Sequence, residues 1–300
     1  MTVHVPTSLA EATELLAANP DARVLAGGTD TMVEVNFNRF KPTNVIALRR
    51  VAELERWSIE GDLVTIGATV PYSRLERGEI AGLFPALAAA ARTVGSPQIR
   101  AAGTLGGNLG TCSPAGDGLP VLAALDATIN LRSTSGVRSV PFRDFMVGPK
   151  RNSANPDELI ESVTMRHTQG FQDYAKVGVR NAMVISVAGV CFVHDTTTAS
   201  VRVGLGSVGP TIIRATEAEA WLASHVDLSS SIRIAEDAAD RFASMVADAA
   251  RPITDHRSTA DYRRHAVRTL AKRLVLRSRS EEHMSELQSH SDLVCRLLLE

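Results

Sequence analysis

Two glycine-rich segments contain the residue types in this chain that are best suited to ligand binding. The first, Gly27-Gly28-Thr29-Asp30, follows a short apolar run, and the second centres on Gly106-Gly107-Asn108. Glycine allows backbone amides to approach an anion closely, because it has no Cβ and adopts positive φ at little cost. Either segment alone is more typical of a tight turn or bulge. Together, with hydroxyl groups at Thr29 and Thr104, they indicate a site for a diphosphate.

A third glycine motif, Gly204-Leu-Gly-Ser-Val-Gly209, matches the G-x-G-x-x-G pattern of dinucleotide-binding proteins. In those proteins the motif opens a helix, and an acidic residue follows about 20 positions later at the end of a second strand. Here Pro210 and the β-branched run Thr211-Ile-Ile213 are unsuited to a helix start, and no such acidic residue follows. We therefore expect a hairpin turn rather than a dinucleotide site.

Catalysis by side chains is not indicated. No serine–histidine pair, carboxylate pair or cluster of metal ligands stands out, and the 8 histidines are scattered. The 3 cysteines, Cys112, Cys191 and Cys295, lack the spacing of an iron–sulfur cluster, a zinc site or a disulfide framework. We predict no catalytic residue and no metal site, so a bound cofactor would supply the chemistry.

The composition argues against several kinds of partner. With 44% hydrophobic residues, 22% charged residues and a net charge of -1, the chain has no excess charge that would draw it to nucleic acid or anionic lipid. No stretch resembles a signal peptide or reaches the roughly 18 apolar residues of a membrane span. We expect a cytoplasmic protein with no nucleic-acid partner and no membrane span.

The first glycine segment should lie at the end of a buried strand in a small β-α-β-loop-β unit. Ser8 and Glu11 form a capping-box pattern that starts a helix. Strands are expected at 23–26 and 44–48, whereas 30–40 fits neither a helical nor a strand period. The glycines of the second segment predict an irregular stretch over 103–117. Around it we expect helices at 84–94 and 119–124 and strands at 63–67, 128–132, 137–140 and 158–165.

The pattern changes near residue 170, where we place a domain boundary. Long β segments at 183–193 and 199–205 predict an antiparallel meander. Three helices are expected to follow, at 215–224, 232–250 and 259–277. The predicted fold class is α+β.

Four motifs give the sequence a resemblance to a known family. They are Leu25-Ala-Gly-Gly-Thr-Asp30, Gly103-Thr-Leu-Gly-Gly-Asn-Leu-Gly-Thr-Cys-Ser-Pro-Ala-Gly-Asp117, Tyr174-Ala-Lys-Val-Gly-Val-Arg180 and Ser258-Thr-Ala-Asp-Tyr-Arg263. In order and spacing the chain resembles, over about residues 1–275, the FAD-binding subunits of molybdenum hydroxylases. This group includes the medium subunits of carbon monoxide dehydrogenases and the FAD-binding subunits of xanthine dehydrogenases.

The resemblance implies a two-part FAD-binding domain of the PCMH (vanillyl-alcohol-oxidase) type over 1–170, with subdomains at about 1–55 and 56–170. A C-terminal domain with a three-stranded antiparallel sheet and three helices would occupy 171–277. Ala26 to Thr31 and Thr104 to Asn108 would hold the pyrophosphate, Asp117 would orient ribityl or ribose hydroxyls, and Lys176 and Ile160 would lie near the flavin. The resemblance implies the following full set of FAD-binding residues: Leu25, Ala26, Gly27, Gly28, Thr29, Asp30, Thr31, Thr104, Leu105, Gly106, Gly107, Asn108, Thr111, Ser113, Asp117, Ile160 and Lys176.

The same resemblance implies an oxidoreductase that works in a hetero-oligomer, a dimer of heterotrimers. A large partner would carry the molybdenum cofactor, and a small partner would carry [2Fe–2S] clusters whose electrons pass through FAD to NAD⁺, a quinone or oxygen. Two alternatives remain open, a stand-alone FAD-dependent oxidase of the same fold and a scaffold without flavin. The chain departs from the family pattern at Asn181-Ala-Met-Val-Ile185 and in the tail 278–300, which has no counterpart there.

Overall fold

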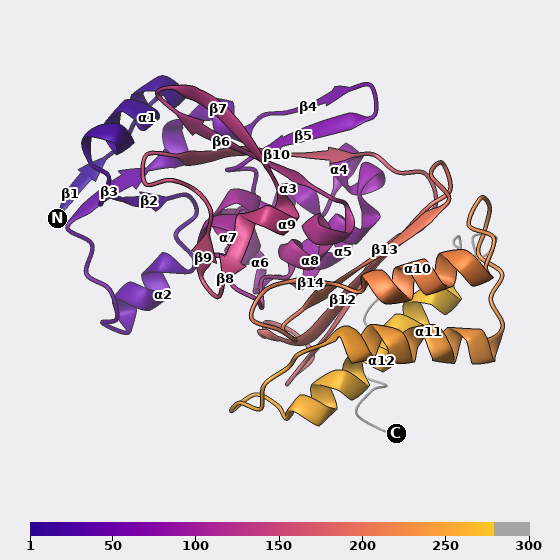
Figure 1. Ribbon diagram of the computed structural model, residues 1–300. Coiled ribbons are helices and arrows are strands. Elements are labelled where there is room, and N and C mark those ends of the chain that lie inside the picture. Colours follow the sequence, from indigo (N-terminus) through magenta and orange to yellow (C-terminus); the bar gives the residue numbers. More distant parts are fainter. Residues whose placement is uncertain (279–300) are drawn as a thin grey trace. The chain divides into compact units, whose positions relative to one another are not determined.

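The computed structural model describes residues 1–278 and forms two compact units (Figure 1). The first unit comprises Met1–Gly82, Ser96–Ser113 and Leu125–His167, and the second comprises Leu83–Gly95, Pro114–Ala124 and the chain from Thr168 onward. The domain boundaries expected at 55, 170 and 277 stay predictions. Apart from Ser278, the tail predicted at 278–300 lies outside the described residues.

The first unit begins with the predicted β-α-β-loop-β unit, whose strands form a small parallel sheet. The strand order is β1 (Thr2–His4), β3 (Asn44–Ala47), β2 (Arg23–Leu25), and helix α1 (Leu9–Ala18) connects β1 to β2. The hydroxyl of Ser8 accepts a hydrogen bond from the Glu11 N–H, as the capping pattern predicts, but the Glu11 carboxylate bonds to Thr7 instead of Ser8. Apolar residues of α1 and β3, including Leu16 and Ile46, form the core beside this sheet.

The first unit also contains a five-stranded antiparallel sheet. Its strand order is β4 (Trp57–Glu60), β5 (Leu63–Gly67), β10 (Leu159–Arg166), β6 (Thr128–Ser133), β7 (Gly136–Pro141). A separate short hairpin consists of β8 (Met146–Gly148) and β9 (Arg151–Asn152). The helices are α2 (Thr31–Asn36), α3 (Tyr72–Leu75), α4 (Gly78–Leu83), α6 (Pro97–Ala102), α7 (Leu105–Thr111) and α9 (Phe142–Phe145), with 3-10 turns at Leu48–Arg50 and Ala52–Glu55.

The second unit has an antiparallel meander, as predicted, extended by one short strand. Its order is β11 (Gln172–Gly178), β12 (Ser186–Asp195), β13 (Ser200–Gly206), β14 (Ile213–Arg214). The helices from the C-terminal part are α10 (Thr216–His225), α11 (Glu236–Ala249) and α12 (Ala260–Arg277). Two further helices come from earlier in the sequence, α5 (Pro85–Thr93) and α8 (Gly118–Ala124). They pack against β11 and β13 respectively.

The third glycine motif is explained by this packing. A Cβ on Gly204 would lie 2.1 Å from the carbonyl oxygen of Pro120, and a Cβ on Gly206 would lie 2.6 Å from the Pro120 ring. Both glycines lie in strand β13. Because they have no side chain, helix α8 can pack closely against this strand. The prediction that no helix follows the motif is confirmed, because β14 pairs antiparallel with β13.

The motif at 258–263 ends in a buried arginine. The Arg263 guanidinium donates to the carbonyl oxygens of Val187 and Ser207, both at 2.8 Å, and to the Asp255 carboxylate at 2.7 Å. Its side chain is 3% exposed. Arg263 thus joins α12 to β12 and to the turn after β13.

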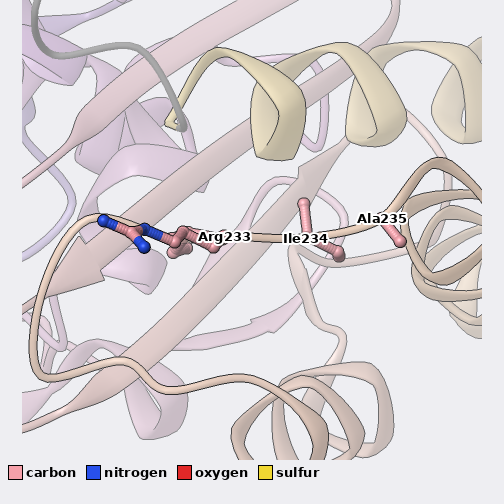
Figure 2. A pocket seen from close by; sticks show the side chains of 4 residues that line it. Arg233, Ile234 and Ala235 are labelled. Atoms are coloured by element: carbon pink, nitrogen blue, oxygen red, sulfur yellow. The ribbon is translucent and has the colours of Figure 1, made fainter.

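The helix predicted from residue 232 begins later. Ile232 and Ile234 are buried while Arg233 and Ala235 are exposed, which is the alternation of an extended segment. Figure 2 shows Arg233, Ile234 and Ala235 along this segment, where they help to line a pocket. Since its lining offers one charged side chain and no acid–base pair, this pocket does not suggest a catalytic site.

Candidate FAD-binding site

The first glycine segment forms a loop with free donors between β2 and α2. Among residues 1–278, the backbone N–H groups of Gly27, Gly28, Thr29 and Asp30 make no intramolecular hydrogen bond. Gly28 has φ 72°, a left-handed conformation that glycine adopts at little cost. Successive N–H groups in a turn of this kind form a concavity that binds anions. We call residues Gly27–Asp30 loop one.

The second glycine segment is helical, so the expectation of an irregular stretch is wrong at Leu105–Thr111. The hydroxyl of Thr104 accepts a hydrogen bond from the Gly107 N–H at 2.9 Å and so caps the helix. The Gly106 N–H donates to the Ala68 carbonyl, and the Asn108 N–H donates to the Thr104 carbonyl. Hence the two segments differ, since loop one has free amides whereas those of the second segment are used within the chain.

The glycines of the second segment serve close packing. A Cβ on Gly106 would lie 2.5 Å from the Cβ of Ala68, a distance that real Cβ atoms do not reach. Gly107 is absent from the residues with positive φ, so a side chain there meets steric limits and not backbone strain. We call Gly103–Asn108 loop two; most of it belongs to helix α7.

The two loops lie directly against each other. A Cβ on Gly27 would lie 1.7 Å from the Ala102 carbonyl oxygen, and a Cβ on Gly103 would lie 3.4 Å from the Thr29 hydroxyl. The Cβ of Ala26 lies 4.0 Å from the position that a Cβ on Gly107 would take. The loops can therefore lie in contact because the glycines on both sides have no side chain.

Asn108 supplies a second indication of a ligand. Its side-chain Oδ1 atom is buried, and among the described residues it has no hydrogen-bond partner. A buried carbonyl oxygen without a donor is costly, so such an atom calls for a bound group that donates a hydrogen. FAD offers both kinds of group that this arrangement lacks, phosphate oxygens for the free N–H groups and hydroxyl donors for Asn108. The residues present therefore fit FAD.

The other predicted residues of the first unit surround these loops. Leu25 ends β2 and its side chain contacts Gly28, while Thr31 begins α2 and Leu105 is fully buried in α7. Ile160 lies at an irregularity in the register of β10, with its Cδ1 atom 3.8 Å from the Cβ position of Gly110. Thr111 is the last residue of α7, and Ser113 follows Cys112, which has φ 52°.

Asp117 and Lys176 belong to the second unit, where they bond to each other. The Lys176 ammonium donates to Asp117 Oδ2 at 2.7 Å and to the carbonyl oxygens of Thr93 and Val184 at 2.9 and 3.2 Å. Asp117 Oδ1 accepts a hydrogen bond from the Tyr174 hydroxyl at 3.0 Å. The ammonium group's three donors are thus all used, and the Lys176 side chain is only 9% exposed.

Burial raises the pKa of two groups in this cluster, Asp117 and Tyr174. Burial raises the pKa of Asp117 above its ordinary value, while the charge and hydrogen bond of Lys176 act in the opposite direction. The pKa of the Tyr174 hydroxyl is also raised, first by burial and then by the neighbouring Asp117. Tyr174 therefore stays a neutral donor to the carboxylate.

Sequence reasoning missed two residues that hold helix α2, the helix after loop one: Glu34 and Lys150. They form an ion pair of 2.8 Å, and Glu34 also pairs with Arg23 at 2.7 Å. Nothing in the local pattern marks them, because 116 positions separate Glu34 from Lys150. Ala68 and Ala102 were also missed. Their backbones lie against Gly106 and Gly27 respectively, and these partners are far apart in the sequence.

The part of the chain that the structure describes shows neither a metal-ligand cluster nor a membrane-spanning helix. Residues 1–278 contain no group of three or more histidine, cysteine, aspartate or glutamate side chains that could hold a metal ion. Over the same residues, no helix has the length and apolar character needed to cross a bilayer.

Comparisons with known proteins agree with this geometry. Residues 1–165 match the family described as the FAD binding domain in molybdopterin dehydrogenase, and residues 173–278 match the CO dehydrogenase flavoprotein C-terminal domain. The chain is 38% identical over 192 residues to the nicotinate dehydrogenase FAD-subunit of Eubacterium barkeri, covering 61% of this chain and 65% of that one. It is 31% identical to the glyceraldehyde dehydrogenase medium chain of Sulfolobus acidocaldarius, covering 88% and 92%.

Among solved structures, carbon monoxide dehydrogenase from Hydrogenophaga pseudoflava matches with a TM-score of 0.83 and 27% identity. The match covers 92% of this chain and 96% of that chain. Both parts of the predicted fold, the FAD-binding domain and the C-terminal domain, are thereby confirmed. The chain belongs to the family of FAD-binding subunits of molybdenum hydroxylases.

Proposed function

We propose that this chain binds FAD between loops one and two and acts as the electron-transfer subunit of a heteromeric molybdenum hydroxylase. The observation that carries the proposal is loop one, with four successive free N–H groups held against glycines of loop two. Bound FAD would supply electron transfer in steps of one or two electrons. The protein's own contribution is to bind and orient that cofactor.

Each part of the site has a distinct proposed role. The N–H groups of Gly27 to Asp30 donate to pyrophosphate oxygens, and the Thr29 hydroxyl adds a donor. Gly106 and Gly107 keep the opposite wall free of side chains, and Asn108 Oδ1 accepts a hydrogen bond from a cofactor hydroxyl. Leu25, Thr31, Thr104, Thr111, Ser113 and Ile160 complete the proposed set in the first unit.

Asp117 and Lys176 keep their proposed roles toward the ribityl or ribose hydroxyls and the flavin ring. Their mutual bonds show that Asp117 would have to accept a cofactor hydroxyl in addition to Tyr174 and Lys176. A carboxylate has about four lone-pair sites, so it can accept further hydrogen bonds. Their role is therefore chemically consistent with an intact pair.

The proposed assembly follows from the names of the relatives, which are FAD subunits and medium chains. We infer a cytoplasmic dimer of heterotrimers in which a large partner holds the molybdenum cofactor and a small partner holds [2Fe–2S] clusters. The electron acceptor would be NAD⁺, a quinone or oxygen. A stand-alone oxidase is less well supported, because these relatives are subunits and the second unit, as far as Ser278, shows no acid–base constellation.

Two measurements test the proposal. First, the purified full-length chain is mixed with FAD, freed of excess cofactor and examined by visible spectroscopy; a flavin spectrum at about one FAD per chain is expected. Second, the chain is purified gently from its native host, and co-purifying chains are identified and assayed for molybdenum and iron. Failure to retain FAD, or recovery of a lone active monomer, would contradict the proposal.

A further inference from the structure

Helix α2, which follows loop one, is held in place by charge and not by apolar burial. None of its residues is buried, and Met32 and Val33 are 49% and 47% exposed. A helix of this length has little stability of its own. Its side-chain anchor is Glu34, whose carboxylate accepts hydrogen bonds from Arg23 at 2.7 Å and from Lys150 at 2.8 Å.

Lys150 lies in the turn between β8 and β9, and this turn is fastened to helix α7. The backbone N–H of Lys150 donates to the Cys112 carbonyl at 3.0 Å, and the Cys112 thiol donates to the Arg151 carbonyl at 3.3 Å. The Asn152 amide donates to the Gly110 carbonyl at 3.4 Å. Lys150 therefore contacts the helix after loop one through its side chain and the end of α7 through its backbone.

We propose that Lys150 and Glu34 are positioning residues that clip loop one to loop two at the separation a diphosphate requires. This inference rests on the proposed FAD site. The Lys150 ammonium donates to Glu34, and through this bond it holds α2 and the free N–H groups of loop one. The hydrogen bond from Lys150 also lowers the pKa of Glu34, which keeps the carboxylate charged.

The clip should affect cofactor affinity more than folding. The Lys150 side chain is 58% exposed and Glu34 is 22% exposed, and ion pairs of this kind contribute little to global stability. Losing the clip leaves loop one more mobile, so ordering it costs binding free energy when FAD binds. We expect FAD affinity to fall by about fivefold, the upper range for one partly exposed pair.

The test uses the full-length chain and its FAD dissociation constant, measured by titrating the cofactor-free protein. Lys150→Met and Glu34→Gln should each weaken FAD binding by about fivefold, and the double variant should bind like Glu34→Gln alone. Lys150→Arg should restore tight binding. Lys41→Met, at an exposed lysine for which no ion pair occurs among the described residues, is the matched control and should bind FAD normally.

Several outcomes would overturn the clip. If Lys150→Met weakens binding while Glu34→Gln does not, Lys150 is a direct phosphate ligand. Additive losses in the double variant would likewise show independent roles. The cofactor-free variants are also compared by thermal unfolding. If they lose as much free energy of unfolding as they lose in free energy of FAD binding, the ion pair has a general structural role. Unchanged FAD affinity in both variants overturns the clip alone, whereas a chain without substitutions that fails to bind FAD overturns the proposed function as well.

Discussion

Gly27 faces the carbonyl oxygen of Ala102 so closely that a Cβ on Gly27 would lie 1.7 Å from that oxygen. No rotamer change relieves such a contact, because both partners are backbone. Loop one and the end of α6 can therefore meet only while position 27 has no side chain. The fit between the two glycine segments rests on this one approach more than on any other.

Gly27→Ala should separate the loops and remove FAD retention. Relief of the clash requires a backbone shift, which costs about 1–3 kcal/mol of folding free energy. Flavin absorbance per chain after gel filtration, together with urea denaturation, measures both effects. The control is Gly82→Ala, since a Cβ there meets nothing within 4 Å; it should keep FAD and leave stability equal or slightly higher. Full FAD content in Gly27→Ala would show that the loops need not touch.

Gly107→Val should lower FAD content by a different mechanism. A Cβ at this position would lie 3.0 Å from the Thr104 hydroxyl, so the larger side chain displaces the helix cap and covers the wall that faces loop one. Loss of the cap costs about 1 kcal/mol. Thr104→Val removes the same cap without adding a side chain at 107, and it separates the two causes. If both variants lose equal amounts of FAD, the cap alone explains the effect.

Lys176→Met should destabilise the second unit strongly. It leaves the Asp117 carboxylate buried without its cation, and breaking a buried pair costs about 3–5 kcal/mol. The double variant Asp117→Asn with Lys176→Met should lose less than the sum of the two single variants. Chemical denaturation of all three measures this coupling. Additive losses would mean that the pair does not act as a unit.

The same variants test the proposed flavin contacts of this pair. Where the protein is still folded, FAD affinity is measured under native conditions and compared with the unsubstituted chain. Asp117→Asn should weaken FAD binding, because an amide oxygen accepts a hydrogen bond from a hydroxyl group less strongly than a carboxylate oxygen does. Unchanged affinity would assign Asp117 and Lys176 to folding alone.

Asp255 predicts a dependence of stability on acid pH. Burial raises the pKa of this carboxyl, but hydrogen bonds from the Arg257 N–H, the Arg263 guanidinium and the Ser258 N–H outweigh it and lower the pKa to about 2. The folded pKa lies below the unfolded one, so the stabilisation is complete above the unfolded pKa, near 3.8, and is lost as the pH falls toward 2. The stability difference between the unsubstituted chain and Asp255→Asn should therefore shrink over this window.

Urea midpoints at several pH values measure that difference. Asp261→Asn is a suitable control, because Asp261 lies on the same helix as Arg263 and its side chain is 97% exposed. Its stability difference from the unsubstituted chain should vary little over the same window. A constant difference for Asp255→Asn would show that the ionised carboxylate does not stabilise the fold.

Much of the fold could be predicted because its signals are local. The Ser8 cap, the strand leading into Gly27 and the meander after residue 170 depend on neighbouring residues, and the structure has all three. The failures share a cause. Helix α7 was expected to be irregular because of its glycines, yet those glycines are tolerated where Ala68 and the first loop approach closely. Such contacts join distant residues and leave no periodic pattern.

The sequence predicted that the two glycine segments lie together, but it did not predict how their backbone amides differ. The motifs brought Gly27 and Gly107 together, which the structure bears out through Ala26. They could not show that loop one has free amides while the Gly106, Gly107 and Asn108 amides of loop two are bonded within the chain, since this depends on which acceptor groups lie nearby. The anchoring of α2 by Lys150 was also invisible, because a surface lysine has no sequence signature.

Helix α8 packs against strand β13 at Gly204 and Gly206. This packing has a consequence for folding during synthesis. All seven residues of α8 are buried, yet strand β13 is made about 80 residues later, which at 5–20 residues per second is roughly 4–16 seconds. Until β13 is synthesised, Pro120 and its apolar neighbours in α8 have no strand to pack against. The second unit must therefore assemble late, and a chaperone that shields residues 118–124 would have its opportunity in that interval.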